Sequence, residues 1–406
     1  MVSLEMNKHP LIKRMLWSCW ILLIYIFGQE IPLPLVKYQS HIRSVVSEPI
    51  RAVISGSGMS NYSIFALGIG PMMIGLIVAA FAMQSKVLGL NRLPSKYNDR
   101  IQMIITILIA LAQAYVSVRN FKLTRPGWET EWQVILVMVA GAMMIMWLCN
   151  MNAKLGLGGP MMIIMANVMV SLLRTVYNSR RLITGGLETW IIVIIGLVIL
   201  VVVIISITLL MDRAEYRIPV IRLGINNQFV DKSYLPVKLS PAGGMPVMFA
   251  MAILSLPQYL FRYLAQAYPH NATFAWWNDN LVLSKTAGVI TYIIILFLFS
   301  IAFALMNMDP EQLAEDYQKS GDYIPGFRPG RATAHYLRGV IVRFSIIGGI
   351  FITLIAGLPL IFAIDRPQYE TLMMFPGNVM MAASFAILML DQIDVILVHG
   401  KYDSIL

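Results

Sequence analysis

The chain has 406 residues, of which 58% are hydrophobic and only 13% are charged, and its mean hydropathy is +0.71. A water-soluble globule cannot hide so much apolar surface, so this composition predicts a multi-pass membrane protein. The formal net charge of +10 fits membrane topology and attraction to anionic lipid, and it gives no reason to expect a nucleic-acid partner.

Ten long apolar segments follow one another along the chain. A helix needs roughly 20 mainly apolar residues to cross the hydrocarbon core of a bilayer, which is about 30 Å thick. The segments that meet this length are 16–36, 63–83, 101–118, 132–149, 157–173, 189–211, 242–261, 286–306, 344–364 and 373–390. Their division into five plus five predicts an all-α protein with two halves, residues 1–185 and 186–406.

The first span is expected to remain as an anchor, because no small-residue cleavage site follows it. If the N-terminus is cytoplasmic, 19 of the 31 Lys and Arg residues fall in cytoplasmic segments. This bias predicts that both termini face the cytoplasm.

The stretch between the first two spans is loose and rich in glycine. Its centre, within about residues 50–60, consists of Ile54, Ser55, Gly56, Ser57 and Gly58. Shortly afterwards Gly68, Gly70 and Pro71 interrupt the opening of a charge-free span. A loose segment that leads into a kinked span favours a gated pore over a rigid anchor.

Two long polar stretches in the second half, 212–240 and 308–343, are expected to be cytoplasmic arms. The first contains β-prone residues on either side of a Gly-Asn turn, which predicts a β-hairpin-like arm. The second begins with Asp309 and Pro310, which predicts a short helix. Arg328 then lies between two Pro-Gly turns, and a rigid turn that presents a guanidinium suits docking to an acidic partner surface.

The spans lack the groups that membrane enzymes and ion-coupled transporters use. None of the 21 Asp and Glu residues lies in the middle of a span, which argues against proton coupling and against a diaspartyl protease. Neither a Ser-plus-base pair nor a phosphate-binding Gly-rich loop is visible. The two cysteines show no metal-ligand spacing. We therefore expect a protein that is not an enzyme, has no metal or other cofactor, and takes energy from a partner ATPase.

Methionine is abundant in the spans, with 28 residues in the chain. Most of these side chains are expected to fill irregular gaps in the core. Those that point at a shared axis would form a compliant gasket, which excludes water and ions at rest and deforms around a passing chain.

Four separated motifs resemble the SecY family of protein translocase channels. Residues 63–71 resemble the start of its second transmembrane helix, and 156–159 the Gly-rich start of the fifth. Residues 234–246 resemble the entry to the seventh helix, and 325–337 the loop between the eighth and ninth.

The resemblance implies two five-helix halves around an hourglass pore, with a plug at about residues 50–60 and a hinge at Gly68, Gly70 and Pro71. It implies a lateral gate between helices two and three on one side and seven and eight on the other. By motif position, the pore ring would consist of Met73, Ile77, Met165, Met169, Met248 and Ser384.

The resemblance also implies partners and a location. The arms would dock a SecA-type motor ATPase through Arg328, Arg331, Arg217 and Arg222, with Arg328 at the position of a functionally important arginine of the family. A SecE-like small membrane subunit would clamp the halves, or other accessory Sec proteins would do so. The cargo would be an unfolded secretory protein, and the location would be the bilayer of the bacterial cytoplasmic membrane.

Several departures from the common family pattern resemble the accessory SecY paralogues of Gram-positive bacteria. Residues 152–155 replace an acidic-and-Arg pattern, and Gly158-Gly159-Pro160 replaces Gly-Asn-Gly. Accessory channels work with a dedicated accessory SecA and export serine-rich, glycosylated surface adhesins. A general housekeeping channel is the alternative within the family. A small-molecule secondary transporter is the alternative of another class, and an intramembrane enzyme is disfavoured.

Overall fold

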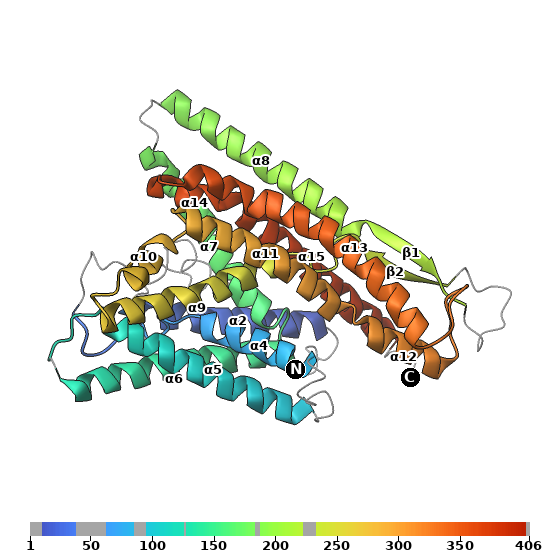
Figure 1. The fold of residues 1–406 in the computed structure, drawn as a ribbon, viewed down its shortest axis with the longest axis horizontal. Helices are drawn as coiled ribbons and strands as arrows, with labels where there is room; N and C mark the ends of the chain where they lie inside the picture. Colours follow the sequence, from blue (N-terminus) through green and yellow to red (C-terminus); the bar gives the residue numbers. More distant parts are fainter. Residues whose placement is uncertain are drawn as a thin grey trace, which may run out of the picture.

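The computed structural model describes residues 10–37, 62–84, 95–125, 127–182, 187–221 and 233–402. Long helices pack side by side into one elongated bundle (Figure 1). Those of the first half are α2 (Pro10–Glu30), α4 (Gly70–Gln84), α5 (Ser95–Val118), α6 (Trp128–Leu155) and α7 (Pro160–Leu182). Those of the second half are α8 (Leu187–Arg213), α9 (Met245–Ala267), α11 (Thr286–Asn307), α13 (Arg331–Ala356) and α15 (Phe375–Tyr402).

The long helices arise where the sequence has continuous apolar runs, because only a helix satisfies every backbone group of such a run in lipid. Among the described residues, nine helices are long and apolar enough to cross a membrane. A tenth apolar helix, over Gly70–Ala82, is shorter. The polytopic helical architecture is therefore confirmed, while the division into halves at residue 185 stays a prediction.

The second expected span begins later than the sequence predicts. Residues 64–69 form turns, and helix α4 begins at Gly70 instead of at residue 63. Gly68 has a φ of +57°, which a right-handed helix cannot continue through. Pro71 then stands in the first turn of α4, where a proline is compatible with the helix.

The first arm is an antiparallel hairpin of β1 (Glu215–Pro219) and β2 (Tyr234–Lys238), as predicted. In its register Glu215 pairs with Lys238 and Pro219 with Tyr234. Residues 222–232, which connect the strands, lie outside the described residues. The hairpin continues directly from α8, since the backbone N–H of Ala214 donates to the carbonyl of Leu210 over 2.9 Å.

The second arm holds the predicted short helix, α12 (Pro310–Ser320). The Asp309 side chain caps it by accepting from the N–H groups of Glu311 and Gln312, and Gly321 ends it with a φ of +78°. Helix α13 begins at Arg331 and runs without a break into the ninth apolar segment.

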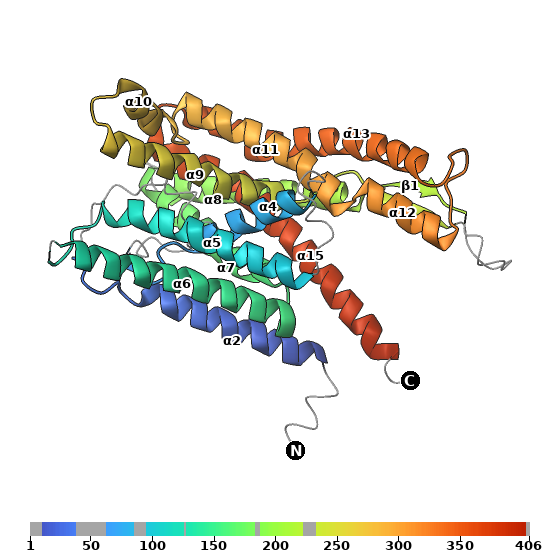
Figure 2. The same ribbon diagram turned by 60° about the horizontal axis from the view of Figure 1, so that its bottom comes forward.

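Short elements fill the remaining connections. They are α10 (Ala272–Asn280), the 3-10 helices η3 (Leu358–Ala363) and η4 (Pro367–Tyr369), and α14 (Glu370–Met373). Figure 2 shows α12 and the hairpin at one end of the bundle and α10 at the other. We call these the arm end and the α10 end. The first residues of α2 and the last of α15 point toward the arm end (Figure 2).

Candidate functional site

The centre of the bundle holds a buried apolar cluster that joins the two halves. Met73 and Ile77 on α4 and Met248 on α9 belong to it, with exposed fractions of 4%, 2% and 5%. The structure thus brings three of the six residues predicted for the pore ring into one packed core. Met380 of α15 is buried in the same cluster, and the sequence analysis did not select it.

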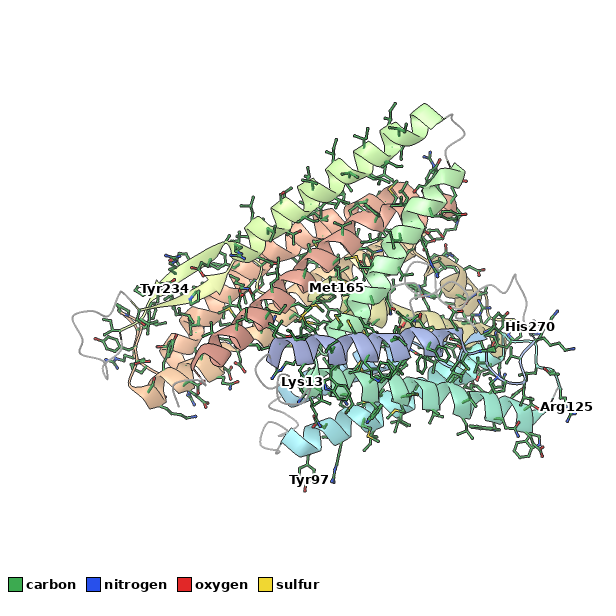
Figure 3. All side chains as sticks on the ribbon, turned by 180° about the vertical axis from the view of Figure 1, so that it is seen from behind. Lys13, Tyr97, Arg125, Met165, Tyr234 and His270 are labelled. Atoms are coloured by element: carbon green, nitrogen blue, oxygen red, sulfur yellow. The ribbon has the colours of Figure 1, made fainter. Side chains whose placement is uncertain are left out.

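The two predicted ring residues on α7 lie elsewhere. Met165 is half-buried and lies near the middle of the molecule (Figure 3), and Met169 is 41% exposed. Both line an apolar groove of about 500 Å³ between α7, α8 and α15. Leu172 and Val176 extend the α7 wall of this groove, and the other walls are formed by apolar side chains of the remaining two helices. Met165 and Met169 are thus not among the residues of the central cluster around Met73 and Met248.

Ser384, the sixth predicted ring residue, is buried at 3% exposure on α15. It packs against Gly244, which precedes α9, so closely that a Cβ on Gly244 would stand 2.8 Å from the Cβ of Ser384. It also lines a small cavity together with Asp212 and Lys238. Ser384 therefore lies beside the start of α9. Met248 lies further along α9, away from the arm end.

The predicted hinge forms a tight turn at the start of α4. Gly68, Gly70 and Pro71 are all buried. The chain before them is held to the end of α2, because the N–H of Ile64 donates to the carbonyl of Ile31 over 3.0 Å. The predicted plug residues Ile54, Ser55, Gly56, Ser57 and Gly58 lie outside the described residues.

A seam runs between α4 and α5 of the first half and α9 and α11 of the second. In it, Phe81 and Phe299 stack with their ring centroids 6.2 Å apart. Toward the α10 end the seam becomes polar, because Arg262 Nη2 donates to Asn120 Oδ1 over 2.8 Å and Gln266 Nε2 does so over 3.3 Å. Contacts therefore join the two sides of the seam both at the ring stack and toward the α10 end. No local sequence pattern singles out these polar residues.

The predicted docking arginines lie on the arms. Arg217 is exposed on β1, where its Nε lies 2.8 Å from Glu215 Oε1 and its guanidinium lies 4.7 Å from the ring centre of Tyr234. The hydrogen bond to the Glu215 carboxylate raises the pKa of Arg217. Arg222 lies outside the described residues.

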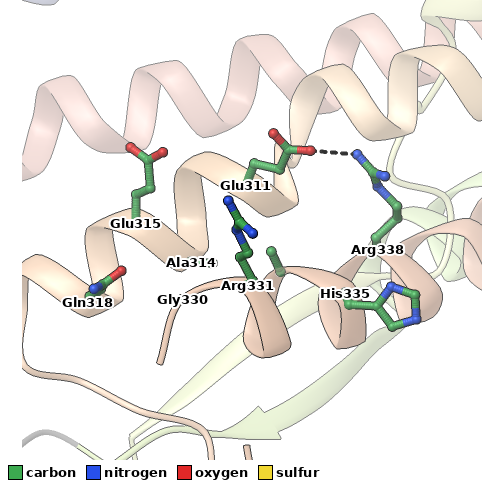
Figure 4. Close-up of a pocket in the computed structure, with 9 residues that line it drawn as sticks. Glu311, Ala314, Glu315, Gln318, Gly330, Arg331, His335 and Arg338 are labelled. Carbon is green, nitrogen blue, oxygen red and sulfur yellow. Dashed lines mark hydrogen bonds and ion pairs between the residues drawn. The ribbon is translucent and has the colours of Figure 1, made fainter. Parts of the chain in front are cut away.

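Arg328 is exposed in a loop whose backbone is fixed on both sides. Gly326 and Gly330 have φ values of +88° and +97°, and the Thr333 hydroxyl donates to the Arg328 carbonyl over 2.9 Å. Arg331 lies just beyond and faces a polar groove of about 630 Å³ between α12 and α13 (Figure 4). An ion pair of 2.8 Å between Arg338 and Glu311 crosses this groove.

The two arms are joined to each other. Ile221, which follows β1, and Tyr323 of the second arm exchange backbone hydrogen bonds of 2.9 and 3.0 Å. The rings of Tyr216 and Phe344 lie 5.5 Å apart and add a second contact. The arms therefore form one platform at the arm end.

A buried polar network surrounds the Gly-rich start of α7. Asn152 accepts from the Ser18 hydroxyl over 2.8 Å and donates to the carbonyls of Leu157 and Gly159 over the same distance. The N–H of Gly158 donates to Gln392 of α15 over 2.9 Å, which links the first half to the second. Among the described residues no group of three His, Cys, Asp or Glu side chains is placed to hold a metal ion.

Comparisons with known proteins agree with this geometry. The family model described as SecY matches residues 63–390. The chain is 32% identical to accessory Sec system protein translocase subunits SecY2 from Leuconostoc gelidum subsp. gasicomitatum and from Streptococcus sanguinis. The alignments cover 98% of this chain in both cases, and 98% and 99% of those two proteins.

Two solved structures share the fold. A structure of a protein-conducting channel has a TM-score of 0.66 at 17% identity, and the match covers 96% of this chain and 93% of that one. Sec61 from the canine ribosome-channel complex has a TM-score of 0.59 at 15% identity, with 96% and 93% covered.

Proposed function

The chain belongs to the SecY family and is a protein translocation channel, and from this premise we propose that it passes unfolded secretory polypeptides across the bacterial cytoplasmic membrane as part of an accessory Sec system. The closed, charge-free centre between α4 and α9 carries this proposal. A pore that must admit side chains of every kind needs a seal without fixed charges.

The seal is a ring of apolar side chains around the centre. Met73, Ile77 and Met248 form its packed part, and Met165 and Met169 on α7 complete it on the other side. Thioether side chains are flexible and polarisable, so such a ring would close without a fixed shape. The plug at residues 54–58 would leave the pore by a movement about the turn at Gly68, Gly70 and Pro71.

The energy comes from an accessory SecA-type ATPase that docks on the arm platform from the cytoplasm. The exposed position of Arg328 between two fixed turns supports this role, as do the exposed side chains of Arg331 and Arg217. Arg222, in the loop between the strands, is the fourth docking residue. This arrangement requires both chain termini to lie on the cytoplasmic side.

A small single-span subunit, SecE-like or an accessory Sec protein, packs on the exposed apolar face of α8, at the outer edge of the groove between α7, α8 and α15. The described lining of this groove is apolar, which matches the surface of a membrane-spanning helix. Helix α8 has a long exposed apolar face beside this groove, since only 11% of its most apolar 18-residue stretch, within Ile191–Arg213, is buried.

Reconstitution in liposomes tests the proposal. The channel is combined with an accessory or a general SecA, and each pair receives either a general preprotein or a serine-rich glycosylated adhesin. We expect protease-protected adhesin only with the accessory motor. Equal transport of both cargoes by both motors would favour a general housekeeping channel. Uptake of neither cargo under any condition would contradict a protein-conducting function.

A further inference from the structure

One acidic residue of the second half is turned into the protein where the first arm meets the bundle. Asp212, near the end of α8, is half-buried and lines a cavity of about 50 Å³. Its Oδ1 would lie 3.9 Å from a Cβ on Gly243, so it faces the start of α9. Ser384 of α15 lines the same small cavity, so the Asp212 carboxylate and the Ser384 hydroxyl border one enclosed space. A hydrogen bond from this hydroxyl to the carboxylate would hold the end of α8 and α15 in a defined position.

Asp212 also stands at the base of the arm platform. Two residues beyond it, the carbonyl of Ala214 accepts from the N–H of Leu239 over 2.8 Å, which closes the base of the hairpin. Ile221 at the far end of β1 is bonded to Tyr323, and the loop from Tyr323 leads to Arg328. Backbone hydrogen bonds therefore link the loop that carries Arg328, through the hairpin, to the end of α8.

On the other side, Ser384 is packed against the pore helices. It touches Gly244 immediately before α9, and Met380 and Met381 one turn along α15 are fully buried in the same cluster as Met248. A shift of Ser384 must therefore move α15 relative to α9, because close-packed side chains transmit displacement.

We propose that Asp212 is a positioning residue of the gate, which holds α15 through Ser384 while the channel is closed and releases it when a motor moves the arms. This inference rests on the proposed function and deepens it. Two charged side chains near Asp212 act on its carboxylate in opposite directions. Lys238 at the end of β2 attracts the carboxylate, whereas Asp391 on α15 repels it.

The test is the resting K⁺ conductance of the full-length channel in planar bilayers, without motor or cargo. Asp212→Asn and Ser384→Ala each remove the charged contact with little change in volume. Each is expected to raise conductance per channel by about fivefold or more. Because both variants break one interaction, the double variant should leak no more than the leakier single variant.

Two further variants act as controls. Asp394→Asn removes an exposed carboxylate from the same helix and should leave conductance unchanged. Asp391→Asn removes the repulsion and should not raise it. Motor binding should open Asp212→Asn channels by a smaller factor than wild-type channels, which a merely destabilised protein would not show.

The inference is overturned if Asp212→Asn and Ser384→Ala channels insert normally and have wild-type conductance. It is equally overturned if the two effects multiply in the double variant. Wild-type channels are assayed for polypeptide transport in parallel. Failure of that transport would count against the proposed function, whereas normal transport with unchanged leak would count against the role of Asp212 alone.

Discussion

The middle and the ends of this bundle are held together by different forces. In the middle, the halves meet through apolar contacts such as the stacked rings of Phe81 on α4 and Phe299 on α11, whose centroids are 6.2 Å apart. At the ends they meet through directional hydrogen bonds. Arg262 donates to Asn120 at the α10 end, and the N–H of Gly158 donates to Gln392 at the opposite end of the bundle. Apolar contacts tolerate sliding, whereas hydrogen bonds select one arrangement.

This difference suits a channel that must seal and open. The apolar middle excludes ions but has no fixed geometry to break, so it can re-form around a passing chain. The polar contacts at the ends select one arrangement of the halves.

The largest effect is expected from Arg328→Glu on the arm platform. A reversed charge in a fixed loop repels an acidic docking surface, so motor-driven transport should fall below detection while membrane insertion stays normal. Transport into vesicles and the amount of inserted channel are measured together. Arg366→Glu, in the region between η3 and η4, is the control. Normal transport by Arg328→Glu would show that Arg328 is a surface charge without a role in docking.

The next largest effect is expected in the apolar middle. Changing Met73, Met165 and Met248 together to Ala removes the flexible side chains of the seal. The resting ion leak should rise by about tenfold or more, and each buried Met→Ala change should cost roughly 2–5 kcal/mol of stability. Conductance per channel checks the first expectation. The same three residues changed to Leu keep the volume and should keep the seal, and a triple-Ala channel with wild-type conductance would exclude these residues from the ring.

Local sequence patterns predicted the elements whose formation depends on nearby residues. Charge-free apolar runs predicted the spans. Asp309 and Pro310 predicted the start of α12, because a capping side chain and a first-turn proline both affect the helix within its first turn. The start of α4 was misplaced because the turn at Gly68 depends on contacts with the end of α2, which lies far away in the sequence.

The contacts that define the closed seam could not be found in this way. Asn120 and Arg262 are 142 positions apart, and each reads as an ordinary polar residue at the end of a span. Asp212 and Ser384 come from different helices and have no local partner that would single them out. The neighbours of Met165 likewise depend on where α8 and α15 are placed, which periodicity does not reveal.

A moderate effect is expected from Asn152→Ala. This change removes the acceptor of the Ser18 hydroxyl proton and the donor to the carbonyls of Leu157 and Gly159, which should cost about 1–3 kcal/mol. Thermal unfolding of the purified channel should shift downward by a few degrees. Asn278→Ala on α10 is the matched control: it removes a solvent-exposed hydrogen bond to the neighbouring Asp279 and should unfold nearly as wild type does. An unchanged midpoint for Asn152→Ala would show that water replaces the lost contacts.

The smallest effect is expected at the polar end of the seam. Asn120→Ala removes the acceptor for Arg262 and Gln266, but the site is partly exposed, so the loss should be only about 1 kcal/mol. That energy would raise the open fraction of the seam by roughly fivefold. Cysteines at Phe81 and Phe299 report opening, because a short cross-linker joins them only while the rings are in contact. If Asn120→Ala left the cross-linking yield unchanged while the methionine variant lowered it, the apolar middle alone would hold the seam shut.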